Sequence, residues 1–122
     1  MTLPHGPTPT HAERCRALVA VARSATLSTI ALDPAGFPYG SLVTVAADAL
    51  GRPLMLLSTL AEHTKNLLAR PEASLLFVED AAVEDAVVDE PLARERVTLL
   101  GGSERVPEGE IADARAAFLA RH

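Results

Sequence analysis

Three short strand-like runs follow one another early in the chain, and this series constrains the fold more than any other feature of the sequence. The runs span residues 26–32, 39–47 and 54–57, and they are rich in apolar and β-branched side chains. The segments between them are short and hold turn-forming residues such as Pro34 and Gly51. Parallel neighbours would need a long crossover connection, so the series predicts an antiparallel meander.

Helical periodicity on both sides of the meander completes the predicted architecture. Helices are expected over residues 12–23, 60–69 and 108–121, and two further strands over 73–78 and 96–106. Thr8 or Thr10 should cap the first helix, and Thr59 with Glu62 forms a capping-box pattern for the second. The element order predicts a mainly β fold with flanking helices (α+β), a small antiparallel barrel with helices at its margins.

Composition then limits the class of protein. The 122 residues are enough for one domain, and we expect a flexible tail over 1–10 and a single domain over 11–122. A net charge of -5 and an aromatic content of 3% argue against a nucleic-acid partner, and no apolar run is long enough for a membrane span. Cys15 is the only cysteine, and the start lacks the features of a signal peptide, so cytoplasmic residence is expected.

An acidic stretch follows the fourth predicted strand. Residues 79–90 hold six of the sixteen acids, and they are interpreted as a solvated loop or edge. The spacing of an EF-hand is absent, so no metal site is expected there or elsewhere.

A polar cluster lies where the third strand ends and the second helix begins. It contains Ser58, Thr59, His63, Thr64, Lys65 and Asn66. Lys65 is the only lysine among eleven basic residues. A helix N-terminus with hydroxyl donors and one cation suits a phosphate, which is the functional interpretation. The alternative is that Thr59 and Glu62 only cap the helix while the other side chains lie on its solvated face.

Glycines inside two predicted strands form the second feature of interest. Gly40 and Ser41 are small enough to let a flat ligand approach the backbone, although Gly40 equally fits a bulge at a barrel corner. Gly101 and Gly102 predict a bulge or a close backbone approach in the last strand.

These segments together resemble a known family. The stretches that carry the resemblance are Tyr39-Gly40-Ser41-Leu42-Val43, Leu57-Ser58-Thr59-Leu60-Ala61-Glu62-His63-Thr64-Lys65-Asn66-Leu67, Pro71 with Ser74-Leu75-Leu76, and Arg96-Val97-Thr98-Leu99-Leu100-Gly101. They look like the pyridoxamine 5'-phosphate oxidase-related, FMN-binding split-barrel family, with the haem-utilisation, HugZ-like branch as the nearest. The likeness extends from about residue 12 to residue 122.

The resemblance implies a homodimer that holds FMN between its subunits and acts as a flavin-dependent oxidoreductase of unknown substrate. By that resemblance Thr64 and Lys65 would grip the FMN phosphate, with Ser58 and Thr59 at the preceding strand end. Tyr39, Gly40, Ser41 and Leu42 would meet the flavin, with His63 and Asn66 as neighbours. No catalytic acid or base is assigned.

Two departures from the family keep an alternative open. The arginine that the true oxidases place on the strand for the phosphate is absent, and the chain stops where larger members continue into an extension that contributes to haem binding. The shortened C-terminus argues against haem degradation. The alternative function is therefore a cofactor-free or haem-binding dimeric split-barrel module without catalysis.

Overall fold

The structure is a computed structural model that describes residues 6–80 and 90–122 of the chain. Its elements are α1 (His11–Val21), β1 (Ser24–Ile30), β2 (Pro38–Ala47), β3 (Pro53–Met55), α2 (Glu62–Ala69), β4 (Glu72–Val78), η2 (Pro91–Ala93), β5 (Arg96–Gly102), η3 (Glu108–Glu110) and α3 (Ile111–Arg121). The predicted order of helices and strands is confirmed.

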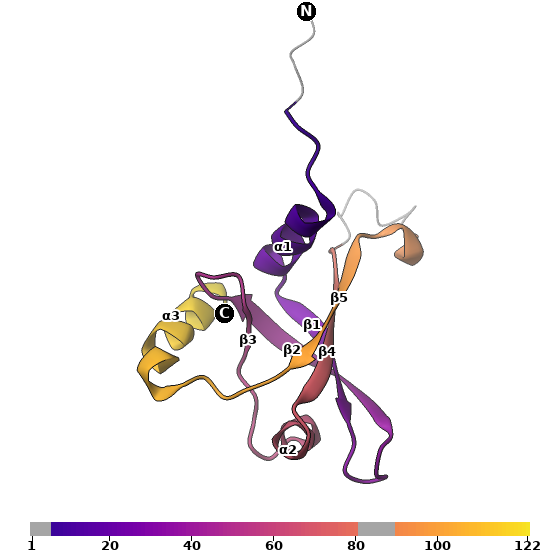
Figure 1. Cartoon of the computed structure of the whole chain (residues 1–122), viewed down its shortest axis with the longest axis vertical. Helices are drawn as coiled ribbons and strands as arrows, with labels where there is room; N and C mark the ends of the chain where they lie inside the picture. Colours follow the sequence, from indigo (N-terminus) through magenta and orange to yellow (C-terminus); the bar gives the residue numbers. More distant parts are fainter. Residues whose placement is uncertain (1–5, 81–89) are drawn as a thin grey trace, which may run out of the picture.

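The strands form one antiparallel sheet in the order β3-β2-β1-β4-β5. Helix α1 lies at one end of the sheet, α2 at the other, and α3 beside β3 (Figure 1). The sheet is half of a barrel, and the prediction of a mainly β fold with flanking helices is confirmed. None of the helices in the part of the chain that the structure describes is long and apolar enough to cross a membrane.

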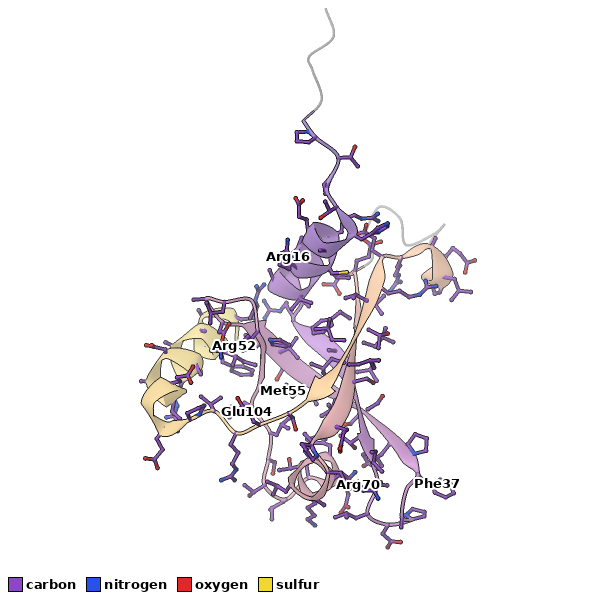
Figure 2. The ribbon with its side chains drawn as sticks, in the orientation of Figure 1. Arg16, Phe37, Arg52, Met55, Arg70 and Glu104 are labelled. Atoms are coloured by element: carbon purple, nitrogen blue, oxygen red, sulfur yellow. The ribbon has the colours of Figure 1, made fainter. Side chains whose placement is uncertain are left out.

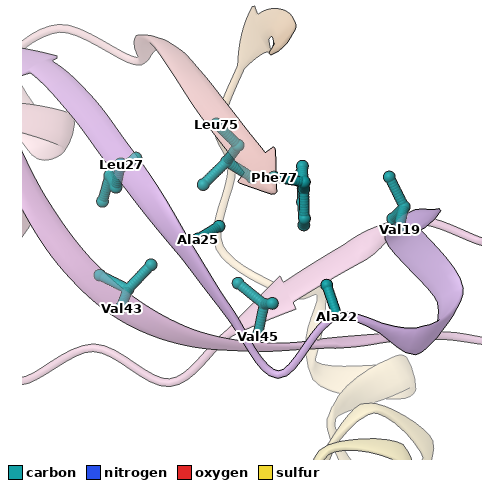
Figure 3. Packing of buried hydrophobic residues seen from close by; sticks show 8 residues of the cluster. All are labelled: Val19, Ala22, Ala25, Leu27, Val43, Val45, Leu75 and Phe77. Atoms are coloured by element: carbon teal, nitrogen blue, oxygen red, sulfur yellow. The ribbon is translucent and has the colours of Figure 1, made fainter. Parts of the chain in front are cut away.

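One face of the sheet, which we call the inner face, carries the core. Strand alternation places apolar side chains of β1, β2 and β4 on this face, where α1 covers them (Figure 3). The core residues are Val19, Ala22, Ala25, Leu27, Val43, Val45, Leu75 and Phe77. Leu27 and Phe77 are fully buried. Burial of such aliphatic surface contributes about 25 cal/mol per Å², so these side chains fix the sheet against its helices.

The opposite face, which we call the outer face, has a different character. At its centre lie Gly40 and Leu42 on β2, Thr26 and Ser28 on β1, Ser74 and Leu76 on β4, and Thr98 and Leu100 on β5. Leu42 and Leu100 are 77% and 82% exposed. The centre of the outer face thus carries hydroxyl and leucine side chains, and the charged residues Glu72 and Arg96 lie on the same face at the starts of β4 and β5.

Helix starts agree with the sequence in one case and differ in the other. Thr10 caps α1 by accepting a hydrogen bond from the backbone N–H of Glu13 at 3.1 Å. The capping box predicted for α2 is wrong, because this helix begins at Glu62, after Ala61, and has no side-chain cap. Ser58 instead accepts the backbone N–H of Leu60, which fixes the turn before the helix.

The glycines within the strands do not interrupt the regular pairing of the sheet. Gly101 and Gly102 pair with Ala73 and Glu72 in regular register, so the predicted bulge is wrong, and a side chain added there would meet nothing within 4 Å. Gly40 pairs regularly with Ser28. Strand β5 ends at Gly102, four residues earlier than predicted, and most of the acidic stretch lies outside the described residues.

The turns use glycine where the backbone requires a positive φ. Gly36 (φ 80°) lies in the β1–β2 turn and Gly51 (φ 81°) in the β2–β3 turn. Phe37 lies at the tip of the β1–β2 hairpin, 62% exposed, while Arg52 lies between the β2–β3 turn and α3 (Figure 2). Arg52 donates to Asp48 and to Glu110 at 2.6 and 3.0 Å, which ties the turn to the start of α3.

Candidate functional site

Asn66 is the most deeply buried of the ten predicted site residues, with 1% of its surface exposed. Its Nδ2 donates to Thr29 Oγ1 at 3.0 Å, and its Oδ1 accepts the backbone N–H of Leu32 at 3.2 Å. Both ends of the amide are therefore used in joining α2 to β1. Thr29 is not among the residues predicted from the sequence. Its hydroxyl lies at an inner position of an alternating strand, and a buried hydroxyl of this kind indicates a hydrogen-bond partner nearby.

His63 lies one helical turn before Asn66 and Leu67, on the side of α2 that faces the sheet. Its Nδ1 is 3.1 Å from Ser41 Oγ on β2. In the tautomer that carries its proton on Nδ1, the imidazole donates to this hydroxyl and keeps the Nε2 lone pair available. The ring is only half-buried. In that tautomer Nε2 can bind a metal ion while the hydrogen bond to Ser41 orients the ring.

The four β2 candidates do not lie together. Tyr39 and Ser41 belong to the inner face with Leu27 and Thr29 as their β1 partners, whereas Gly40 and Leu42 belong to the outer face. Successive strand residues point to opposite faces, so one ligand cannot meet all four side chains of a single chain from the same side. The structure brings Ser41 together with His63 and separates Gly40 and Leu42 from them.

The remaining candidates line the loop before α2 and its first turn. Thr64 Oγ1 donates to the carbonyl of Ser58, so this hydroxyl already serves the loop. Thr59 is exposed. Lys65 is about half exposed, and its Nζ lies 3.5 Å from Glu62 Oε1. An exposed pair of this kind contributes little to folding, so Lys65 stays available to an anion.

Two clefts lie elsewhere on the chain. One has a volume of about 400 Å³ and is lined by Arg23, Ala46, Ala47, Ala117, Ala120 and Arg121. The other, of about 230 Å³, lies between the end of α1 and the end of β4. Neither cleft is lined by any of the ten predicted site residues. The His63–Ser41 pair thus lies outside both of these clefts.

Comparison with known proteins gives the family. Residues 7–122 match the family described as CREG, beta-barrel. This chain belongs to the CREG β-barrel family. It is 41% identical over 96 residues to the protein named "Non-canonical heme oxygenase HOZ, chloroplastic" from Arabidopsis thaliana, covering 79% of this chain and 27% of that protein.

Solved structures give the same fold. A heme binding protein from Mycobacterium smegmatis superimposes with a TM-score of 0.82 at 38% identity, covering 96% of this chain and 45% of the other. HutZ, described as a heme storage protein from Vibrio cholerae, superimposes with a TM-score of 0.60 at 22% identity, covering 82% and 68%. This chain therefore spans less than half of the length of the Arabidopsis and Mycobacterium proteins. The split-barrel prediction is confirmed.

The predicted cofactor is wrong. The relatives at 41% and 38% identity carry names that refer to haem and not to FMN. The resemblance to the pyridoxamine 5'-phosphate oxidase-related family is confirmed only for the split-barrel fold. A helix start with hydroxyls and one cation accommodates carboxylates as well as phosphates, so the polar cluster alone could not tell the two cofactors apart.

Proposed function

We propose that this protein is a haem-binding split-barrel module that works as a homodimer. The observation that carries the proposal is the identity of 41% and 38% to two proteins named for haem. The residues around α2 supply the chemistry that the proposal needs, and the open outer face supplies the surface for a second copy.

The donor set near α2 fits haem. A histidine nitrogen is a common ligand of haem iron, and His63, which is half-buried and has its Nδ1 within hydrogen-bond distance of Ser41, would be that ligand here. The two propionates of haem are carboxylates that pair with cations and hydroxyls. Lys65 is exposed in the first turn of α2, and Thr59 is exposed in the loop before that helix. Bound haem would supply an iron centre there, while the chain supplies its ligand and orients the ring.

The outer face is the surface that a second copy would cover in the proposed homodimer. The outer face leaves Leu42 and Leu100 exposed with Thr26 and Thr98 around them. Leucine side chains this exposed on a sheet face are typical of an interface, and a two-fold axis lets the outer faces of two copies pack together.

The haem proposal is tested by titrating the purified protein with haemin and following the Soret band. We expect saturable binding, with the affinity of His63→Ala reduced at least tenfold and its Soret maximum shifted. His11→Ala is the matched control, because His11 is an exposed histidine at the start of α1. Added imidazole should restore the Soret maximum of His63→Ala.

The outcomes separate the two parts of this proposal. Absence of any saturable Soret change in the native protein would refute haem binding. Saturable binding that His63→Ala leaves unchanged in affinity and spectrum would retain haem and reject His63 as the ligand.

The homodimer is tested by sedimentation equilibrium. Leu42→Arg places a charge on the outer face and should raise the dimer dissociation constant at least tenfold. Leu50→Arg is the control, because Leu50 is 78% exposed in the β2–β3 turn and lies outside the outer face. Equal dissociation constants for both variants would place the interface elsewhere.

A further inference from the structure

The cleft of about 400 Å³ lies between the last turn of α3 and the far end of β2. It is lined by two arginines, Arg23 and Arg121, and by four alanines, Ala46, Ala47, Ala117 and Ala120. Ala46 is buried, as is Val45 on the other face, so this end of β2 is covered from both sides. The cleft thus lies at an end of β2 that is packed on both faces.

Arg121 is held in place by the end of another helix. Its Nη1 donates to the carbonyl of Val21 at 3.2 Å, and its Nη2 donates to the carbonyl of Ala20. These carbonyls have no partner within α1, since the last turn of a helix leaves its carbonyls free. A guanidinium has five N–H donors, and three of those on Arg121 remain for another acceptor.

In the part of the chain that the structure describes, the side chain of Arg23 does not join two elements by hydrogen bonds as that of Arg121 does. Its carbonyl accepts the backbone N–H of Val45 at 3.0 Å, which fixes its position next to the cleft. Within residues 6–80 and 90–122 its guanidinium makes no hydrogen bond or ion pair. Glu79 and Asp80 line the second cleft, on the other side of Arg23, without forming an ion pair with it.

The charge of this cleft contrasts with the rest of the molecule. The chain has a net charge of -5, and Arg14, Arg52 and Lys65 each pair with a carboxylate. The cleft holds two arginines and no acidic residue among its lining side chains. Guanidinium groups bind carboxylates and phosphates with paired N–H donors, and the four small alanine side chains leave room for a small apolar body.

We propose that Arg23 and Arg121 form a binding site for a small anion, a carboxylate or phosphate ester with a flat or compact apolar part. The site is separate from the haem proposal, because none of its lining residues belongs to the α2 region. Arg121 donates hydrogen bonds to the carbonyls at the end of α1 and has further N–H groups for the anion. Arg23 supplies the second positive charge.

The test is an NMR titration of the ¹⁵N-labelled full chain with benzoate, acetate and inorganic phosphate at constant ionic strength. We expect saturable shifts at the backbone amides of Ala46, Ala47, Ala117 and Ala120 with at least one of these probes. Tighter binding of benzoate than of acetate identifies a carboxylate with an apolar body, and tightest binding of phosphate identifies a phosphate.

Variants make the assignment specific. Arg23→Gln should weaken the tightest probe about tenfold or more, because a charged hydrogen-bond donor is lost. Arg115→Gln, on the same helix as Arg121 but outside the cleft, and Arg16→Gln, on α1, are the matched controls and should change affinity less than twofold. The proposal is overturned by an absence of localised shifts, or by equal affinities in Arg23→Gln and the two controls.

Discussion

The two faces of the sheet share the same strands and yet have opposite environments. On the inner face Leu27 is 0% exposed, whereas on the outer face Leu42, one strand away, is 77% exposed. Helices α1 and α2 make the difference, since they cover the inner face with Val19, Ala22 and Leu67. The comparison teaches that alternation along a strand assigns a face, while the packing of helices decides which face becomes the core.

The largest expected effect tests this comparison with a matched pair of leucines. Leu27→Ala should lower the free energy of unfolding by about 2–5 kcal/mol, because it leaves a cavity in a packed core. Leu42→Ala should change it by less than about 0.5 kcal/mol at concentrations where the chain is monomeric. Urea unfolding followed by circular dichroism measures both. Similar losses for the two variants would mean that the outer face is also a core.

The second largest change in the free energy of unfolding is expected at Asn66, whose side-chain amide is buried between α2 and β1. Asn66→Ala should cost about 1–3 kcal/mol, because Thr29 Oγ1 and the backbone N–H of Leu32 lose their partner. Thr29→Val should cost a similar amount. The double variant should cost less than the sum of the two, since each single change leaves a buried group unpaired. Strict additivity in this double-mutant cycle would contradict the observed hydrogen bond.

A smaller effect is expected at the turn that joins β2 to β3. Burial raises the pKa of Asp48, but hydrogen bonds from the backbone N–H and guanidinium of Arg52 and from the N–H of Leu50 outweigh it, so the pKa is lowered overall. The ionised carboxylate therefore stabilises the fold above the unfolded-state pKa of about 4, and this stabilisation is lost as the pH falls through the lower folded-state pKa.

The corresponding variant is Asp48→Asn. At pH 7 we expect it to lose about 1 kcal/mol of stability relative to the native chain, and the loss should shrink as the pH drops below about 4. Asp33→Asn, in the exposed β1–β2 turn, serves as the control and should show little change. Thermal unfolding across this pH range measures the difference, and a loss independent of pH would reject the electrostatic explanation.

The smallest effect concerns Lys65, which is adjacent in sequence to Asn66 but has the opposite environment. Lys65→Met should change the free energy of unfolding by less than about 0.5 kcal/mol, because its ion pair with Glu62 is exposed. It should weaken haemin binding by a measurable factor if Lys65 pairs with a propionate. Unfolding and haemin titrations on the same sample distinguish a structural role from a binding role.

Much of the fold could be predicted from the sequence. The alternating strands, the turns that hold Pro34 and Gly51, and a threonine cap for the first helix are local features. The structure contains all of them, and of the two candidate caps, Thr8 and Thr10, it shows Thr10. The predictions of a capping box and of a bulge at Gly101 are wrong. The local sequence at both places permits more than one conformation, and contacts with the surrounding structure determine which one forms.

The candidate site could be predicted only as a segment. The sequence predicts residues 58–66 as a polar cluster at a helix start, and the structure places them in the loop before α2 and in its first turns. Their environments differ: Asn66 is buried and hydrogen-bonded to β1, His63 pairs with Ser41, and Lys65 is exposed. The types and spacing of the side chains do not indicate which residue of the sheet each side chain of α2 contacts. The cofactor prediction failed for the same reason, because the segment offers donors that suit several anions.

By itself the sequence determined the element order, the antiparallel pairing of neighbours and the two alternating faces, since these depend on local periodicity and short connections. Only the tertiary structure decided that Asn66 is buried against Thr29, and that Arg23 and Arg121 line one cleft. These residues are distant along the chain. Their proximity follows from the packing of α2 and α3 on the sheet, which is the sum of many contacts and has no local signal.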